Sequence, residues 1–272
     1  MPDNGWPADR IDTESAHSAR IYDYILGGKD YYPADKEAGD AMAREWPALP
    51  IHMRANRDWM NRAVRWLAEE AGIRQFLDIG TGIPTSPNLH EIAQSVAPAS
   101  RVVYVDNDPI VMMHAQALLV GDPRGVTSYL EADVRDPGAI LQRPELRETL
   151  DLDRPVGLLL VALLHFVHDD EQVEGIVREL VGALAPGSHV VLSHGTMDLS
   201  DAEGIAAYEQ MFAAGGTDVR ARSRATLERW LAGLEILEPG IVPVADWRPD
   251  DPDAPRPVSR DLGIYGVVAR KP

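Results

Sequence analysis

The sequence has no cysteine, only three phenylalanines and few basic residues, with 26 Lys and Arg against 43 Asp and Glu. The absence of cysteine excludes disulfides, a thiolate nucleophile and a zinc-thiolate site, and it fits a reducing, cytoplasmic setting. The net charge of -17 repels a phosphate backbone, so we do not expect a nucleic-acid partner. A small molecule is the expected partner instead.

Long hydrophobic runs are also missing. The longest apolar run, residues 156–167, is too short to span a bilayer and contains a histidine. No N-terminal apolar segment indicates export. We therefore expect no membrane partner and a cytoplasmic protein, while the oligomeric state stays open.

The length of 272 residues favours one elaborated domain over two. Residues 1–18 are polar and contain proline and glycine, so they predict a flexible tail. Residues 19–272 then form the domain, in which a helical cap over 19–72 precedes the core over 73–272. Apolar spacing through 53–67 predicts the longest helix of that cap.

Strand-like and helical runs alternate through the core. Because parallel strands need a crossover helix between them, this βαβα pattern predicts an α/β, Rossmann-like, doubly wound and mostly parallel sheet. The last two strand-like segments, LEILEPGIVPV and LGIYGVVAR, have no predicted helix between them and are expected to pair antiparallel. In such sheets, ligands bind at the carboxyl ends of the strands.

A glycine-punctuated turn follows the first strand in FLDIGTGIPT, where Asp78 precedes Gly80, Thr81 and Gly82. Two glycines let the backbone turn sharply and approach a ligand closely. The third glycine of the dinucleotide fingerprint is missing, and so is the lysine of a phosphate-binding loop. Alone, the turn is weak evidence for any one ligand.

Two further acids end the next two strands, Asp106 in VYVDNDP and Asp133 in LEADVRD. A carboxylate at the second strand end can accept both hydroxyls of a ribose, in NAD and in S-adenosylmethionine alike. Asp78 supplies an acceptor for an ammonium group, and Asp133 one for the amine of an adenine. Any one of these acids also fits a helix cap or a turn, but three in succession favour a nucleoside cofactor.

These motifs resemble those of class I S-adenosylmethionine-dependent methyltransferases, which have a seven-stranded sheet. The match extends to ARIYDYILGGKDYYPAD, LLHFVHDD and LSHGT, which resemble a methyltransferase family long catalogued as a domain of unknown function. The resemblance implies methyl transfer from S-adenosyl-L-methionine. The cofactor contacts that it implies are Asp78, Gly80, Gly82, Asp106, Asn107, Asp133 and Val134, with Thr81 in the same turn.

Residues 22–32 gather four of the eight tyrosines around a Gly-Gly pair. This segment is typical either of plain packing or of a lid whose aromatic rings exclude water and face a sulfonium. If the segment is a lid, Tyr22 and Gly28 contact the cofactor, and we assign them so. Whether this lid moves stays open.

Histidines follow two neighbouring strands, and we select His165 as the base or the group that orients the acceptor. A metal site is not expected, because no compact ligand motif occurs. Two rival functions remain: an S-adenosylmethionine-binding regulator without turnover and an NAD-dependent oxidoreductase. The acceptor itself is expected to be a small molecule.

Overall fold

The computed structural model describes residues 12–118, 121–215 and 218–272, so most of the predicted tail lies outside the described residues. The described end of that tail, from residue 12, forms hydrogen bonds with the first helix. Both terminal nitrogens of Arg20, in helix α1 (Ser18–Ile25), donate to the carbonyls of Asp12 and Ser15. Hydrogen bonds from the first helix thus reach residues 12 and 15 of the predicted tail, whose flexibility stays a prediction.

The core is a mixed β-sheet of eight described strands in the order β3-β2-β1-β4-β5-β8-β6, with β7 paired to the other end of β8. The strands are β1 (Gln75–Ile79), β2 (Arg101–Asp106), β3 (Val126–Glu131), β4 (Gly157–Val161), β5 (His189–Gly195), β6 (Glu235–Ile236), β7 (Val242–Pro243) and β8 (Ile264–Arg270). Strands β1 to β5 run parallel. The strand order reverses between β1 and β4, which confirms the doubly wound prediction.

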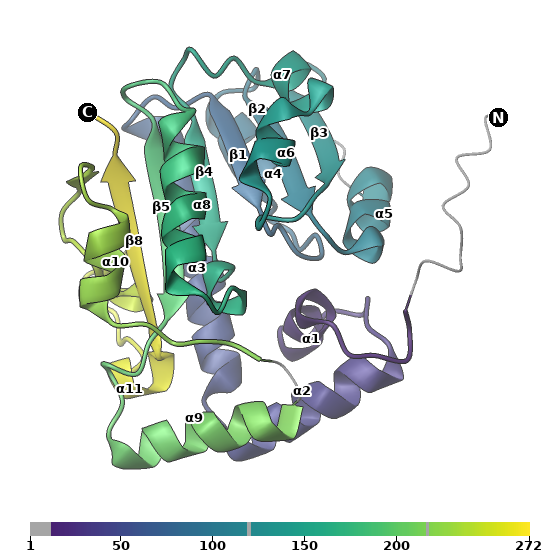
Figure 1. The fold of residues 1–272 in the computed structure, drawn as a ribbon, viewed down its shortest axis with the longest axis vertical. Coiled ribbons are helices and arrows are strands. Elements are labelled where there is room, and N and C mark those ends of the chain that lie inside the picture. The colour runs from purple at the N-terminus through teal and green to yellow at the C-terminus, as the bar shows by residue number, and fades with distance from the viewer. Residues whose placement is uncertain (1–11, 119–120, 216–217) are drawn as a thin grey trace.

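Helices cover both faces of this sheet (Figure 1). They are the second half of α3 (Leu49–Glu69), α4 (Leu89–Val96), α5 (Pro109–Leu118), α6 (Pro137–Gln142), α7 (Pro144–Thr149), α8 (Asp170–Gly182) and α10 (Arg224–Trp230). The short α11 (Ser259–Leu262) packs on α3, and the 3-10 turns are η2 (Leu164–Phe166) and η3 (Val244–Asp246). Along β4, Leu158 and Leu160 join the cluster under α8, whereas Leu159 joins the cluster that contains Trp59. Because strand side chains alternate between faces, an uninterrupted apolar run is what a doubly covered strand requires.

The C-terminal strands complete the sheet. Strand β8 pairs antiparallel with β5 along seven residues, and β6 and β7 pair antiparallel with opposite ends of β8. This confirms the predicted antiparallel pairing. The expected seventh strand is divided into two short ones, since the chain leaves the sheet between Ile236 and Val242.

A helical layer lies beyond the carboxyl ends of β1, β2 and β4 (Figure 1). It consists of α1, α2 (Pro33–Glu45), the first half of α3 (Leu49–Glu69) and α9 (Ala202–Gly215). We call it the cap. Its apolar side chains form a separate cluster around Ile21, Met42, Leu49, Met53 and Met211. Helix α9 was not predicted from the sequence, and it joins the cap by packing against α2.

No helix among the described residues is long and apolar enough to cross a membrane.

Candidate cofactor and acceptor site

The turn after β1 has the conformation that its glycines predict. Gly80 and Gly82 adopt φ values of +74° and +67°, which L side chains rarely adopt. A Cβ on Gly80 would lie 2.6 Å from Leu163 Cδ1, whereas a Cβ on Gly82 would meet nothing within 4 Å. The N–H groups of Gly80 and Thr81 donate to the Val105 carbonyl, which fixes the turn beside β2.

Asp78 lies at this turn with 5% of its surface exposed. Burial raises the pKa of its carboxyl from 3.8 to about 6, and a hydrogen bond from Thr81 and the charge of Arg57 oppose that shift only in part. The terminal nitrogen Nη2 of Arg57 donates to the carbonyls of Thr85 and Pro87. A buried carboxylate that lacks its own ion pair suits a cationic group of a ligand.

Asp106 lies at the end of β2, where backbone donors hold its carboxylate. The N–H of Gly82 donates to Oδ2 at 2.9 Å and the N–H of Asp108 to Oδ1 at 3.0 Å. Burial nevertheless raises the pKa of Asp106. Each carboxylate oxygen keeps a further lone pair, so two neighbouring hydroxyls can both donate to it.

Asp133 follows β3 and is more exposed. Its Oδ1 accepts from the N–H of Arg135, and its Oδ2 accepts from Nη1 of Arg135 at 2.9 Å and from Nδ2 of Asn107 at 3.2 Å. Val134 lies beside it with 7% of its surface exposed. An acid (Asp133), an amide (Asn107) and an apolar side chain (Val134) therefore lie together near the end of β3.

These three strand ends line one cavity of about 340 Å³ that continues beneath the cap. Such a volume is in the range of small-molecule sites. Ten of the eleven residues selected from the sequence line it: Tyr22, Asp78, Gly80, Thr81, Gly82, Asp106, Asn107, Asp133, Val134 and His165. We call the part at the strand ends the cofactor half. The cap half is walled by Met42, Trp46, Leu49, Met53, Met211 and Phe212.

Gly28 is the exception, since it does not line the cavity. Its N–H donates to the Asp23 carbonyl at 2.8 Å, and a Cβ there would lie 2.0 Å from Asp23 Oδ1. The Asp23 carboxylate also accepts from the N–H of Asp30. In this structure Gly28 makes room for the turn after α1, and its assignment to the cofactor stays a prediction without support from the cavity lining.

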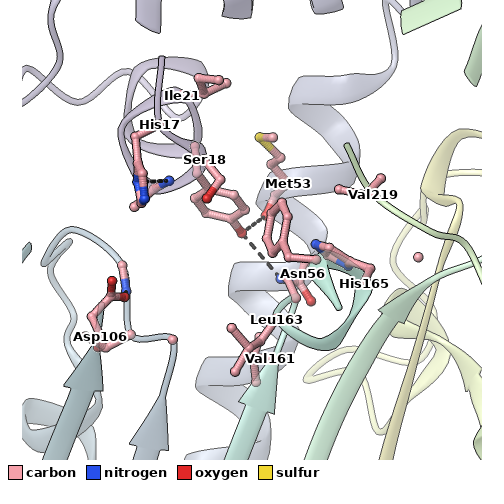
Figure 2. Close-up of a pocket in the computed structure, with 18 of the residues that line it drawn as sticks. His17, Ser18, Ile21, Met53, Asn56, Asp106, Val161, Leu163, His165 and Val219 are labelled. Atoms are coloured by element: carbon pink, nitrogen blue, oxygen red, sulfur yellow. Dashed lines mark hydrogen bonds between the residues drawn. The ribbon is translucent and has the colours of Figure 1, made fainter. Parts of the chain in front are cut away.

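His165, in the 3-10 turn after β4, faces the cavity (Figure 2). Its Nδ1 is buried and has no hydrogen-bond partner among the described residues. Burial holds the pKa of His165 well below 6.5, and His194, His52 and Arg222 lower it further. The ring is therefore neutral at pH 7.

His194 and Arg222 behind His165 are structural. Nη1 of Arg222 donates toward Nε2 of His194 at 3.2 Å, and Nδ1 of His194 contacts the Gly195 carbonyl at 2.8 Å. Arg222 also forms an ion pair with Asp170 at 2.8 Å. Within the described residues, no group of three or more His, Cys, Asp or Glu side chains is arranged to hold a metal ion.

Hydrogen bonds of Tyr22 connect α1 to α3 at Met53 and Asn56, two residues that line the cavity. Tyr22 Oη donates to the Met53 carbonyl at 2.8 Å and accepts from Asn56 Nδ2 at 3.4 Å. Asn56 is 2% exposed, and its Oδ1 has no partner among the described residues. Asn56 was not among the residues predicted from the sequence, although a polar residue between Met53 and Met60 on an apolar helix face is a usable signal.

A joint of buried charges fixes the cap to the core beside Asp106. His17 Nδ1 lies 3.1 Å from Asp108 Oδ2, and Arg20 Nε lies 3.8 Å from the same oxygen. Arg20 Nε is also 3.5 Å from Asp35 Oδ1, which accepts from the N–H of His17 at 2.8 Å. No local pattern indicates this joint, because Asp108 lies far along the chain from the other three members, in the first helical segment and α2.

The strand order, the glycine turn and the three acids at consecutive strand ends define a class I S-adenosylmethionine-dependent methyltransferase. At the level of the fold alone, TnmH is similar, with 18% identity and a TM-score of 0.51 over 83% of this chain and 57% of that protein. A family model described as S-adenosyl methyltransferase matches residues 4–272, and the chain belongs to this family.

Two solved structures are similar along nearly the whole chain. A protein of the family catalogued as DUF574, from Streptomyces avermitilis, is 62% identical with a TM-score of 0.90, over 96% of this chain and 99% of that one. A candidate methyltransferase from Thermobifida fusca is 39% identical with a TM-score of 0.87, over 98% of both chains. No protein with a curated description matches.

Proposed function

We propose that the protein methylates a small-molecule acceptor held in the cap half of the cavity, with S-adenosylmethionine in the cofactor half. The observation that carries this proposal is the buried carboxylate of Asp78 beside the glycine turn, on the same cavity as Asp106 and Asp133. Asp78 would bind the ammonium group, Asp106 the ribose hydroxyls and Asp133 the adenine amine. The turn at Gly80, Thr81 and Gly82 would follow the methionine part.

When bound, S-adenosylmethionine supplies a methyl group on a sulfonium that is its own leaving group. The protein's contribution is then mainly to position the acceptor and to exclude water. Residues 19–72 supply much of the enclosing wall, including Tyr22, Trp46 and Met53. Asn107 and Val134 would border the adenosine.

Calorimetry with S-adenosylhomocysteine tests the cofactor assignment. We expect the wild-type protein to bind it, and Asp106→Asn to weaken binding about tenfold or more, because a neutral amide accepts less strongly than a carboxylate from two hydroxyls. Circular dichroism serves as the folding control. Equal affinity in the two proteins would remove Asp106 from the ribose site.

Two rivals are tested with the same protein. An oxidoreductase would bind NAD, whereas we expect no NAD binding because the turn lacks the third glycine of the dinucleotide fingerprint. A regulator without turnover would bind S-adenosylmethionine and never consume it. Formation of S-adenosylhomocysteine that depends on an added acceptor excludes that function.

A further inference from the structure

The cap half of the cavity offers no charge to an acceptor. Its walls are the thioethers, aliphatic groups and aromatic rings defined above. His52 also lines it, and burial lowers the pKa of His52 to about 4, with its Nδ1 at the Leu262 carbonyl. His165 is neutral as well. Both imidazoles are therefore uncharged at pH 7.

Asp78 and Asp106 line the cofactor half and are assigned to the cofactor. The other charged side chains that line the cavity have protein partners, although Nε of Arg57, beside the glycine turn, has none among the described residues. Arg57 donates to the carbonyls after the glycine turn, and Arg135 is paired with Asp133. His17 faces Asp108 in the joint, and the Asp23 carboxylate is held by the turn at residues 28–30. An anionic or ammonium acceptor in the cap half would thus be buried without a partner, which is costly.

Polar groups without charge do converge there. A Cβ placed on Gly195 would lie 3.9 Å from His165 Nδ1 and 3.9 Å from Tyr208 Oη, so both atoms border the same space. Tyr208 Oη forms no hydrogen bond with another described residue, and burial raises the Tyr208 pKa, which keeps the phenol protonated. Asn56 Oδ1 is the third unpaired group, toward Val161 and Leu163 (Figure 2).

A hydroxyl group matches this set, because it donates one hydrogen bond and accepts another. It can donate to Nδ1 of neutral His165 and accept from Tyr208 Oη. A ligand that leaves these buried groups without hydrogen bonds binds much more weakly than one that forms them. Methionine and aromatic side chains around the hydroxyl favour contact with a flat aromatic body.

We propose that the acceptor is an uncharged, apolar hydroxy compound of aromatic type, methylated on oxygen and oriented by His165 and Tyr208; this rests on the proposed function. A lone pair of the acceptor oxygen forms the new O–C bond while the S–C bond of the donor breaks and its electron pair returns to sulfur. The hydroxyl proton passes to His165 Nδ1 and from there to solvent. Even an imidazole of low pKa takes this proton, since a methylated hydroxyl is strongly acidic until it loses the proton.

The test measures binding of two probes to the protein saturated with S-adenosylhomocysteine. 2-Naphthol carries the hydroxyl, and 2-naphthoate carries a carboxylate on the same ring system. We expect 2-naphthol to bind at least tenfold more tightly than 2-naphthoate. Tyr208→Phe should weaken 2-naphthol binding about five- to tenfold and leave the affinity for S-adenosylhomocysteine unchanged.

Tyr24→Phe is the matched control, because Tyr24 lies in the same cap but its hydroxyl bonds to Asp40 and Lys36 outside the cavity. It should change neither probe's affinity. Equal binding of the two probes, no binding of 2-naphthol, or an unchanged affinity in Tyr208→Phe overturns the inference. Failure to bind S-adenosylhomocysteine would instead overturn the proposed function, so the two failures are distinguishable.

Discussion

At the scale of single residues, the site depends on how burial changes the protonation of its acids and histidines. The sequence predicted which acids meet, since strand ends converge whatever the side chains are. It did not predict their ionisation, because the raised pKa of Asp78 comes mainly from burial, which Thr81 and Arg57 offset only in part, and burial depends on how the folded chain encloses the turn.

Asp78 makes cofactor affinity depend on pH. Its folded-state pKa of about 6 lies above 3.8, so its contribution to stability is present below pH 3.8 and is lost as the pH rises through about 6. The ammonium group of the cofactor binds the ionised carboxylate of Asp78 more tightly than the neutral carboxyl. We therefore expect S-adenosylhomocysteine to bind more tightly as the pH rises from 5 to 7, by up to about tenfold.

Calorimetry at several pH values checks this dependence, and Asp78→Asn is the comparison. The variant should bind more weakly at pH 7 and show a flatter profile, with Asp106 responsible for any slope that remains because its pKa is also raised. Parallel pH profiles in the two proteins would show that Asp78 does not bind the ammonium group.

His165 should contribute to turnover as a hydrogen-bonding group more than as a general base. A general base of well-matched pKa contributes about 10²- to 10⁴-fold, whereas burial holds the His165 pKa well below 6.5. We expect His165→Ala to lower kcat about tenfold, to change affinity for S-adenosylhomocysteine less than twofold, and to leave the pH–rate profile flat between pH 6 and 8. A loss beyond 10³-fold, or a kcat equal to wild type, contradicts this role.

At the scale of secondary-structure elements, the cap is the part that the sequence described least well. Its first helices were predicted from apolar spacing, but α9 was not. Helix α9 buries Met211 against α2, not against the sheet, so its burial depends on a partner more than 150 residues earlier in the chain. The acceptor side of the cavity, with Tyr208 and Met211, was therefore not predictable from local pattern.

The buried joint should couple cap docking to cofactor binding. Arg20→Met keeps the length of the side chain but leaves Asp35 and Asp108 without the guanidinium, and Asp108 donates its N–H to Asp106. Breaking a buried ion pair is strongly destabilising. We expect about tenfold weaker binding of S-adenosylhomocysteine and faster proteolysis within residues 12–48.

Lys36→Met is the control for that experiment. Lys36 pairs with Asp40 in the same cap, but both side chains are about half exposed, so the pair contributes little. Affinity and proteolysis should match wild type. If Arg20→Met behaves like this control, the joint does not govern cap docking.

At the scale of the whole molecule, the fold was predictable and the enclosure of the site was not. The alternation of strand-like and helical runs indicated the doubly wound, mostly parallel sheet, because each parallel strand needs a crossover helix. The closed cavity needs contacts between the first and last thirds of the chain. The packing of α2 on α9 and the contact between His52 and the Leu262 carbonyl are examples of pairings that no local pattern indicates.

The packing of α3 on β8 joins the N-terminal helices to the C-terminal strand and should limit the stability of the whole protein. A Cβ on Gly266 would lie 2.6 Å from the fully buried indole of Trp59. Overpacking of this kind costs about 1–3 kcal/mol, so Gly266→Ala should lower Tm by roughly 3–10 °C in a thermal melt. Gly182→Ala, where a Cβ meets nothing within 4 Å, should leave Tm unchanged or slightly raised. Because Gly266 does not line the cavity, both variants should keep the wild-type affinity for S-adenosylhomocysteine at 20 °C. An unchanged Tm in Gly266→Ala would contradict the prediction, since it would mean that Trp59 moves aside without cost.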